Sequence, residues 1–285
     1  MSRIAYVDGV YQPIDVPGIH VEDRGYQFAD GVYEVCAVHN TRLIDEDAHL
    51  DRLERSLAEL GIAAPMSRAA MKIVVRETLA RNRIRNGIVY MQVTRGVATR
   101  DHNYPAGLKP VLAVTVRRSD PARRASVLRD GISVVTVPDQ RWARCDIKSI
   151  SLLPNVLARQ TAKDKGVQEA WQVDADGLVT EGAATNAWIV DSAGILRTRP
   201  ANGGILNGIV RQSIIGLLGE LDLKFEERAF SVEEALAARE CFSTASTLAV
   251  FPVVSIDGHD IGDGKPGAVA LEIFNQYDQH SLTDI

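Results

Sequence analysis

Two spacings of hydrophobic residues run along the chain, and they separate predicted strands from predicted helices. Apolar runs of strand length, alternating or continuous, occur at 4–7, 10–14, 32–38, 88–94 and 111–116. A helical spacing appears instead at Leu50, Leu53, Leu57 and Leu60. We expect Asp47 to cap this helix and Gly61 to end it. Ser67 is expected to cap a second helix that ends near Arg83.

The second half of the chain mixes both patterns without strict alternation. Strands are expected at 133–137, 224–227 and 249–254, and helices at 155–165, at 209–221 and after Ser231. Residues 119–124 are polar, contain Pro121 and lie between two strand blocks, so they are the best candidate for a linker. The expected fold class is α+β, or mixed α/β, with one domain at 1–118 and a second at 125–285.

Composition narrows the function classes. The chain has 285 residues, 46% hydrophobic and 24% charged, which is ordinary for a globular protein with one large or two medium domains. A net charge of −5 and the lack of a basic block argue against nucleic-acid binding. No signal peptide and no apolar run of membrane-spanning length is visible, so the cytoplasm is the expected location. The cysteines and histidines lack disulfide-framework or metal-ligand spacing, and no metal is expected.

Lys148 is the most informative single residue. Ile147 precedes it, and Ile150, Leu152 and Leu153 follow, so we expect it to project from a buried strand. Burial removes hydration from an ammonium group and lowers the pKa of a lysine, which makes the amine a nucleophile for a carbonyl.

Three further segments suit an aldehyde cofactor that carries a ring nitrogen and a phosphate. Glu181 is expected to be partly buried, where its partner is either a protonated pyridine nitrogen or an arginine. The glycine-rich segment 203–208 precedes a helix and lacks nucleotide-binding motifs, so it is a phosphate-binding turn or a plain turn. The hydroxyls of 243–247 either complete a phosphate site or cap their own backbone.

Two other sites have simple alternative explanations. Arg52 lies roughly a third of a turn off the leucine stripe, so periodicity predicts a solvated position. Arg100 and His102 lie on the polar loop 95–109, where an extended backbone points both side chains the same way. Together they suit a substrate carboxylate, although a solvated loop is the more frequent explanation for such residues.

In sequence order, several motifs make the chain resemble the D-amino-acid aminotransferases of class IV, which are pyridoxal-phosphate enzymes of fold type IV. The resemblance covers essentially the whole chain. Its most specific segments are Glu-Asp-Arg-Gly-Tyr-Gln-Phe at 22–28, Asp-Gly-Val-Tyr-Glu-Val at 30–35, Gln-Val-Thr-Arg-Gly at 92–96, Arg-Cys-Asp-Ile-Lys-Ser at 144–149, and Thr-Glu-Gly at 180–182 with Asn186.

The resemblance implies a small N-terminal α/β domain, a larger C-terminal domain with a barrel-like β core, and a homodimer with shared active sites. It implies that Lys148 holds pyridoxal 5'-phosphate as an internal aldimine and moves the substrate Cα proton. Glu181 is the implied partner of the pyridine nitrogen, and Leu206 packs on the ring. The implied phosphate site consists of Arg52, Ile209, Val210, Ser246 and Thr247. The implied carboxylate trap consists of Tyr33, Arg100 and His102, the last two from a neighbouring subunit.

The expected reaction is amino transfer between a D-amino acid of the D-alanine or D-glutamate type and a 2-oxo acid. The alternatives of the same fold are an aminodeoxychorismate-lyase type, a branched-chain L-amino-acid transaminase and an (R)-amine transaminase. A binding protein without catalysis is a further alternative, which the presence of both Lys148 and Glu181 disfavours. One departure is Ala183-Ala184-Thr185, where relatives often carry serines. It leaves substrate orientation open, as do the roles of Arg141, Arg144 and Asn207.

Overall fold

The computed structural model describes residues 3–16, 18–221 and 223–283, which form two compact units. The first unit comprises residues up to Ser119 together with Ile147–Ser151, and the second comprises Asp120–Asp146 and the chain from Leu152 onward. No helix in the described ranges combines the length and the apolar character that a bilayer span requires.

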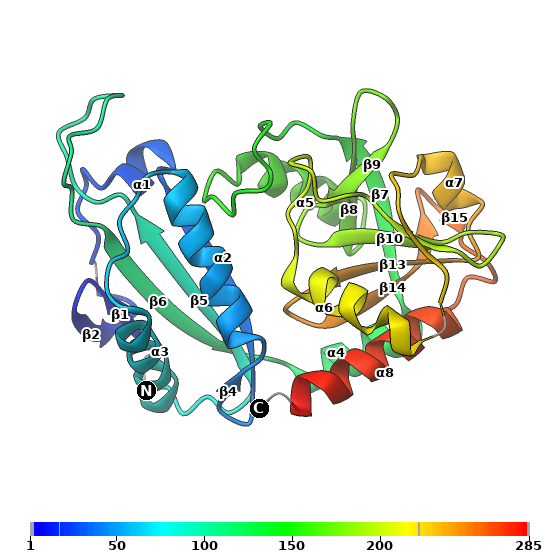
Figure 1. Ribbon diagram of the computed structural model, residues 1–285, viewed down its shortest axis with the longest axis horizontal. Helices are drawn as coiled ribbons and strands as arrows, with labels where there is room; N and C mark the ends of the chain where they lie inside the picture. Colours follow the sequence, from blue (N-terminus) through cyan, green and yellow to red (C-terminus); the bar gives the residue numbers. More distant parts are fainter. Residues whose placement is uncertain (1–2, 17, 222, 284–285) are drawn as a thin grey trace. The chain divides into compact units, whose positions relative to one another are not determined.

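The first unit is an antiparallel sheet in the order β2-β1-β6-β5-β3-β4, with helices packed on it (Figure 1). Its elements are β1 (Ile4–Val7), β2 (Val10–Pro13), α1 (Arg24–Phe28), β3 (Gly31–His39), β4 (Arg42–Leu43), α2 (Glu46–Glu59), α3 (Arg68–Arg81), β5 (Gly87–Thr94) and β6 (Val111–Arg118).

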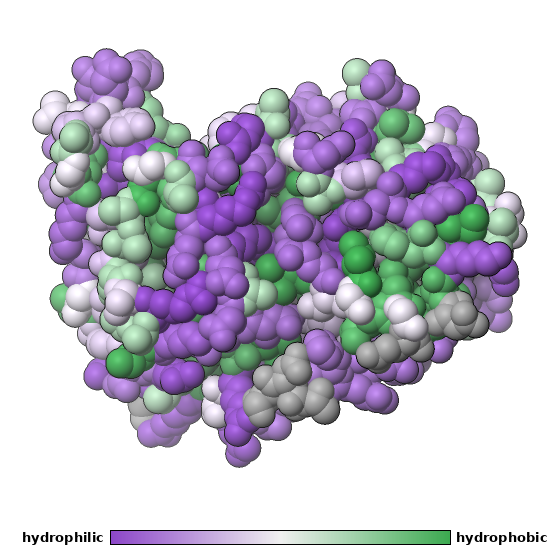
Figure 2. All heavy atoms as spheres, viewed as in Figure 1, coloured by the Kyte–Doolittle hydropathy of each residue, from purple (hydrophilic) through white to green (hydrophobic). Residues whose placement is uncertain are grey.

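The core of this unit forms between one face of the sheet and the helices α2 and α3. Buried and half-buried positions alternate along β3 and β5, as a strand with one covered face requires. The leucine stripe is on the inside, since Leu50, Leu53 and Leu57 are buried and Leu60 packs against the core at its edge. The outer face of α2 is hydrophilic (Figure 2), and it carries the exposed Asp51.

The second unit is built on a mixed sheet in the order β12-β11-β10-β13-β14-β7-β8-β9, with β15 paired to β14. Its elements are α4 (Pro121–Asp130), β7 (Ile132–Pro138), α5 (Leu153–Asp164), β8 (Glu169–Val173), β9 (Val179–Gly182), β10 (Asn186–Val190), β11 (Leu196–Thr198), α6 (Ile209–Leu217), the 3-10 helix η1 (Leu218–Glu220), β12 (Phe225–Glu227), α7 (Val232–Leu236), β13 (Glu240–Ala245), β14 (Ala249–Ile256), β15 (His259–Asp260) and α8 (Ala268–Thr283).

This sheet curls, because β9, at the end of the strand order, also lies against β10. Every residue of β9 and β10 is buried, so these strands are covered on both faces. The core centres on Trp171 and Phe230, whose rings meet edge to face. A carboxylate placed on β9, as Glu181 is, therefore lies inside the protein rather than on its surface.

The structure differs from the sequence-based expectations in several local features. The expected linker is the start of α4, for which Asp120 is the N-cap and accepts a hydrogen bond from Ala122 N. Asp47 lies in the first turn of α2 rather than at its cap, because the preceding Asp45 takes a left-handed conformation. Ser67 caps α3 as predicted. The helices α1 and α8 were not predicted.

The segment Ile147–Ser151 is the most consequential difference. It is not a strand: Ser149 forms a single bridge with Val32 of β3, and Lys148 itself is half-buried. The segment packs with the first unit, where Ile147 joins the core, although the prediction assigned it to the C-terminal domain. The apolar residues around Lys148 correctly indicated that the segment is buried. They could not show whether it is a strand or an irregular segment that crosses the end of a strand.

Candidate active site

Lys148 is held by β3 and α2 through its backbone. Tyr33 N donates to Lys148 O at 3.0 Å, and Lys148 N donates to Ser56 Oγ at 3.4 Å. The side chain turns to the same strand, because Lys148 Nζ donates to Tyr33 Oη at 3.4 Å and lies 4.4 Å from the centre of that ring. Two residues that the sequence assigned to one site are therefore in contact.

Tyr90 of β5 supports Tyr33 from the neighbouring strand. The two rings stack with centroids 5.6 Å apart, and Tyr90 Oη donates to Gln92 Oε1 at 2.6 Å. Burial, with a smaller contribution from Tyr33, raises the pKa of Tyr90 to about 12, so this phenol stays protonated at neutral pH. No motif in the sequence assigns Tyr90 a role, although Gln92 lies in one of the motifs.

Arg52 is buried, and its expected solvated position is wrong. Its guanidinium forms a two-pronged pair with Glu34, from Nε to Oε1 at 2.7 Å and from Nη2 to Oε2 at 2.8 Å. His49 Nδ1 lies 2.7 Å from the same Oε2. Burial raises the pKa of Glu34, but the charge and hydrogen bonds of Arg52 and His49 outweigh it and lower this pKa to about 2. The ion pair with the Glu34 carboxylate stabilises Arg52 in its buried position. The spacing of the leucines alone does not predict this pair.

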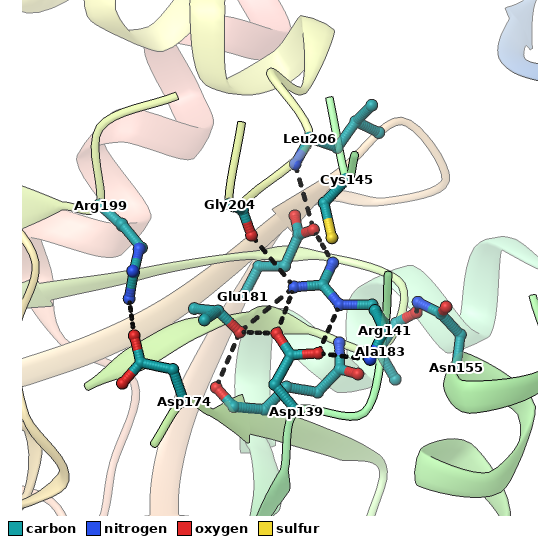
Figure 3. Close-up of polar contacts among 12 residues, drawn as sticks. Asp139, Arg141, Cys145, Asn155, Asp174, Glu181, Ala183, Arg199, Gly204 and Leu206 are labelled. Atoms are coloured by element: carbon teal, nitrogen blue, oxygen red, sulfur yellow. Dashed lines mark hydrogen bonds and ion pairs between the residues drawn. The ribbon is translucent and has the colours of Figure 1, made fainter. Parts of the chain in front are cut away.

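Glu181 lies on β9, and its carboxylate accepts hydrogen bonds from three residues, of which Arg141 and Leu206 are shown in Figure 3. Arg141 Nη1 donates to Oε1, Leu206 N donates to Oε1 at 3.1 Å, and Asn186 Nδ2 donates to Oε2 at 2.9 Å. Both expectations for Glu181 concerned a partner for a buried carboxylate, and the structure provides the arginine. These contacts fix the orientation of the carboxylate.

Arg141, whose role the sequence left open, is the centre of this polar network (Figure 3). Its Nη2 donates to Asp139 Oδ2 at 2.7 Å, to Thr180 Oγ1 at 3.3 Å and to Gly204 O at 3.3 Å. Burial lowers the pKa of Arg141, but the hydrogen bond to Asp139 and the charge of Glu181 have the larger effect. The pKa of Arg141 is therefore raised above its ordinary value. Arg141 therefore keeps its positive charge against Glu181 and links the carboxylate to the glycine-rich turn.

The start of α6 offers backbone donors in a buried place. Gly208 is the N-cap and provides no side-chain hydrogen bond, while Ile209 and Val210 in the first turn are buried. First-turn N–H groups have no partner within a helix, and the helix dipole favours an anion there. A Cβ at position 208 would collide with Asn186 Oδ1, so any larger residue would displace the Asn186 side chain. This arrangement fits a phosphate group.

The hydroxyl cluster divides into two parts. Ser243 and Thr244 lie inside β13, where they accept hydrogen bonds from the indoles of Trp171 and Trp188 at 2.9 and 3.0 Å. These two hydroxyls therefore fix buried tryptophans, a role that neither sequence-based alternative included. The turn between β13 and β14 carries the other two predicted residues, Ser246 and Thr247, and Thr247 is exposed.

Arg100 and His102 lie on the exposed loop that joins β5 to β6. Both approach the ring of Phe28: the Arg100 guanidinium carbon lies 4.8 Å from its centroid, and the His102 ring lies 5.7 Å from it. The two side chains therefore lie against the same ring, and their role in binding a carboxylate remains a prediction.

The predicted site residues are divided between the two units. The first unit carries Lys148, Tyr33, Arg52, Arg100 and His102, and the second carries Glu181, Leu206, Ile209, Val210, Ser246 and Thr247. Among the residues that the structure describes, no cluster of His, Cys, Asp and Glu is arranged to hold a metal ion.

Comparison with known proteins identifies the family. The family model described as amino-transferase class IV matches residues 31–256. A D-alanine aminotransferase of Bacillus licheniformis is 43% identical over 256 residues, covering 90% of this chain and 89% of that protein. A D-alanine aminotransferase of Staphylococcus haemolyticus is 38% identical over 281 residues, covering 97% and 98%. The chain belongs to the class IV aminotransferase family.

Solved structures agree on the fold. A branched-chain amino acid aminotransferase from Escherichia coli superposes with a TM-score of 0.87 at 22% identity, covering 98% of this chain and 94% of that one. A hypothetical aminotransferase from Mycobacterium tuberculosis in a PLP-bound form gives 0.83 at 22%, covering 99% and 100%. The predicted mixed α/β fold is confirmed by these structures. With the curated relatives, the predicted enzyme class is confirmed too: the chain is a pyridoxal-phosphate-dependent transaminase.

Proposed function

We propose that this enzyme transfers the amino group of a D-amino acid, of the D-alanine or D-glutamate type, to a 2-oxo acid. The observation that carries the proposal is the position of Lys148. Its amine donates to a phenol oxygen, and within the described part of the first unit no carboxylate forms an ion pair with it. An amine that no carboxylate holds can approach an aldehyde carbon, and in its deprotonated form it acts as a nucleophile and as a base. The D-specific part rests on the motifs and on the relatives.

The residues present fit pyridoxal 5'-phosphate. Lys148 would hold its aldehyde, the oriented Glu181 its ring nitrogen, and Leu206 its ring face. Its phosphate would be bound by Arg52, the first-turn N–H groups of Ile209 and Val210, and the turn residues Ser246 and Thr247. When bound, the cofactor supplies a carrier for the amino group and a cationic ring that draws electrons from the substrate Cα.

In this proposal each protein group has a separate task. Lys148 removes the proton from the substrate Cα and returns it to the acceptor carbon, first as a base and then as an acid. Glu181 keeps a proton on the ring nitrogen, and Asn186 and Arg141 hold Glu181 in place for that task. Tyr33, Arg100 and His102 orient the substrate carboxylate, with Arg100 and His102 supplied by the neighbouring subunit of a homodimer.

The first experiment tests the lysine and the substrate class together. Holoenzyme is treated with borohydride and digested, and mass spectrometry should locate the cofactor on Lys148. Lys148→Ala should lose the adduct and the turnover of D-alanine with 2-oxoglutarate, whereas the exposed Lys163→Ala should retain both. Full turnover by Lys148→Ala would refute the assignment.

Substrate assays separate the alternatives within the fold. D-alanine and D-glutamate should be faster amino donors than L-leucine and 1-phenylethylamine, and 4-amino-4-deoxychorismate should release no pyruvate. A preference for L-leucine, for the amine or for the lyase substrate would replace the proposal by the corresponding alternative.

The shared carboxylate site is tested with two impaired variants. Arg100→Ala should raise KM for D-amino acids and spare an amine without a carboxylate, since only the former needs the guanidinium. In a dimer refolded from equal amounts of Lys148→Ala and Arg100→Ala, one site in each mixed dimer combines both intact residues. Activity at low D-alanine concentration should then recover to about a quarter of the wild-type value. No recovery would place Arg100 in its own subunit's site.

A further inference from the structure

The loop between β5 and β6 does not by itself hold side chains in the fixed positions that a binding site needs. Residues 99–104 are exposed and form neither helix nor strand. A loop of this kind samples many conformations, and ordering it costs backbone entropy. The proposed trap residues Arg100 and His102 lie in this stretch, so something outside the loop must fix its shape if they are to bind a small carboxylate tightly.

Arg24, in the first turn of α1, binds the backbone of this loop. It is 3% exposed, and its Nη1 donates to Asp101 O at 2.7 Å while Nη2 donates to His102 O at 3.2 Å. Nη1 also lies 3.5 Å from Asn103 O. One buried guanidinium thus reaches three consecutive carbonyl groups in the segment that carries the trap.

Arg24 is itself fixed by its neighbours. Nε donates to Asp30 Oδ2 at 2.9 Å, and Arg95 Nε donates to the same oxygen at 2.7 Å. Burial raises the pKa of Asp30, but these hydrogen bonds and charges lower it below its ordinary value, so the counterion stays ionised at neutral pH. The centre of the Tyr104 ring lies 5.6 Å from the guanidinium carbon of Arg24 and 3.7 Å from that of Arg95.

Phe28, at the other end of α1, completes the support. The guanidinium carbons of Arg24 and Arg100 lie 4.7 and 4.8 Å from its ring centre, and His102 lies close to the same ring. Asp23, the N-cap of α1, accepts a hydrogen bond from Thr94 Oγ1 at 2.8 Å, which fastens α1 to β5. Arg24, which binds the loop carbonyls, and Phe28, which contacts the loop side chains, both belong to the Glu-Asp-Arg-Gly-Tyr-Gln-Phe motif. The proposed chemistry has no other use for this motif.

We infer that Arg24 is a positioning residue that sets the substrate-carboxylate affinity by holding the loop of Arg100 and His102 in its binding shape. The inference rests on the proposed function, in which these two residues bind the carboxylate. A planar guanidinium can donate to Asp30 and to successive carbonyls at once, whereas a lysine ammonium has three donors at one point. Charge alone therefore does not replace Arg24.

The test compares Arg24→Met and Arg24→Lys with Arg81→Met. Arg81 is a matched control in the same unit, since it also pairs with a carboxylate, Glu77, and lies over a tyrosine ring, Tyr11. We expect both Arg24 variants to raise KM for D-alanine about ten- to a hundredfold with little change in kcat, and the control to leave both unchanged. The amide hydrogen of Asn103, which donates to Asp101 Oδ1 at 2.8 Å, should exchange faster in the Arg24 variants only.

A double variant separates positioning from general damage. If Arg24 acts through Arg100, then Arg24→Met combined with Arg100→Ala should lose little more kcat/KM for D-alanine than Arg100→Ala alone. Independent, additive losses would overturn the inference, as would full function of Arg24→Lys or unchanged exchange in the loop. Failure of the proposed function would give a different result. Arg100→Ala would then leave KM for D-alanine unchanged, while faster amide exchange in the Arg24 variants would still show that Arg24 holds the loop.

Discussion

The buried pair of Glu34 and Arg52 allows a stability prediction with a defined magnitude. Glu34 is fully buried and Arg52 nearly so, and His49 contacts the same carboxylate. Glu34→Gln keeps the shape of the side chain but removes its charge, which leaves a buried guanidinium opposite a neutral amide. We expect the free energy of unfolding to fall, since loss of one partner of a buried pair costs about 3–5 kcal/mol.

The pKa of Glu34 gives a second measure of the same interaction. A decrease from 4.5 to about 2 corresponds to about 3 kcal/mol of preference for the ionised carboxylate in the folded state. A surface pair provides the contrast: Glu54 is 54% exposed and pairs with Arg68, so Glu54→Gln should cost less than about 1 kcal/mol.

The assay must report on the first unit. The three tryptophans, at 142, 171 and 188, all lie in the second unit, so their fluorescence does not follow the first. Urea unfolding should instead be followed by far-UV circular dichroism, with hydrogen exchange of β3 and β5 as a local measurement. If Glu34→Gln costs no more than Glu54→Gln by both measurements, the buried pair does not stabilise the unit and the reasoning is wrong.

Three further predictions concern acid and close packing. Because the pKa of folded Glu34 lies below its unfolded value, its stabilisation is present above about pH 4.5 and is lost as pH falls towards 2, so acid titration of Glu34→Gln should be flatter in that window. Gly208→Ala should displace Asn186 and weaken cofactor binding, measured by loss of the cofactor on dialysis. Gly25→Ala should collide with Thr94 and lower the thermal midpoint, measured by calorimetry; no loss in either variant would contradict the contact.

The sequence determined most elements because local patterns are sufficient for them. Alternation gave β3 and β5, the leucine stripe gave α2, and Ser67 marked the start of α3. The motifs also identified the transaminase class, because Lys148 and Glu181 occur within specific local contexts. Their roles as cofactor-binding residues remain predictions.

Only the tertiary structure decided which charges are buried and which groups they contact. Periodicity put Arg52 in solvent, yet Glu34, 18 positions away, draws it into the core. No local pattern links Arg141 to Glu181, or Arg24 to carbonyls 77 and 78 positions further on. Local spacing encodes the strands and helices. The partner of a buried charge depends on which distant segments the fold brings within hydrogen-bonding distance, because an ion must be paired wherever it leaves water.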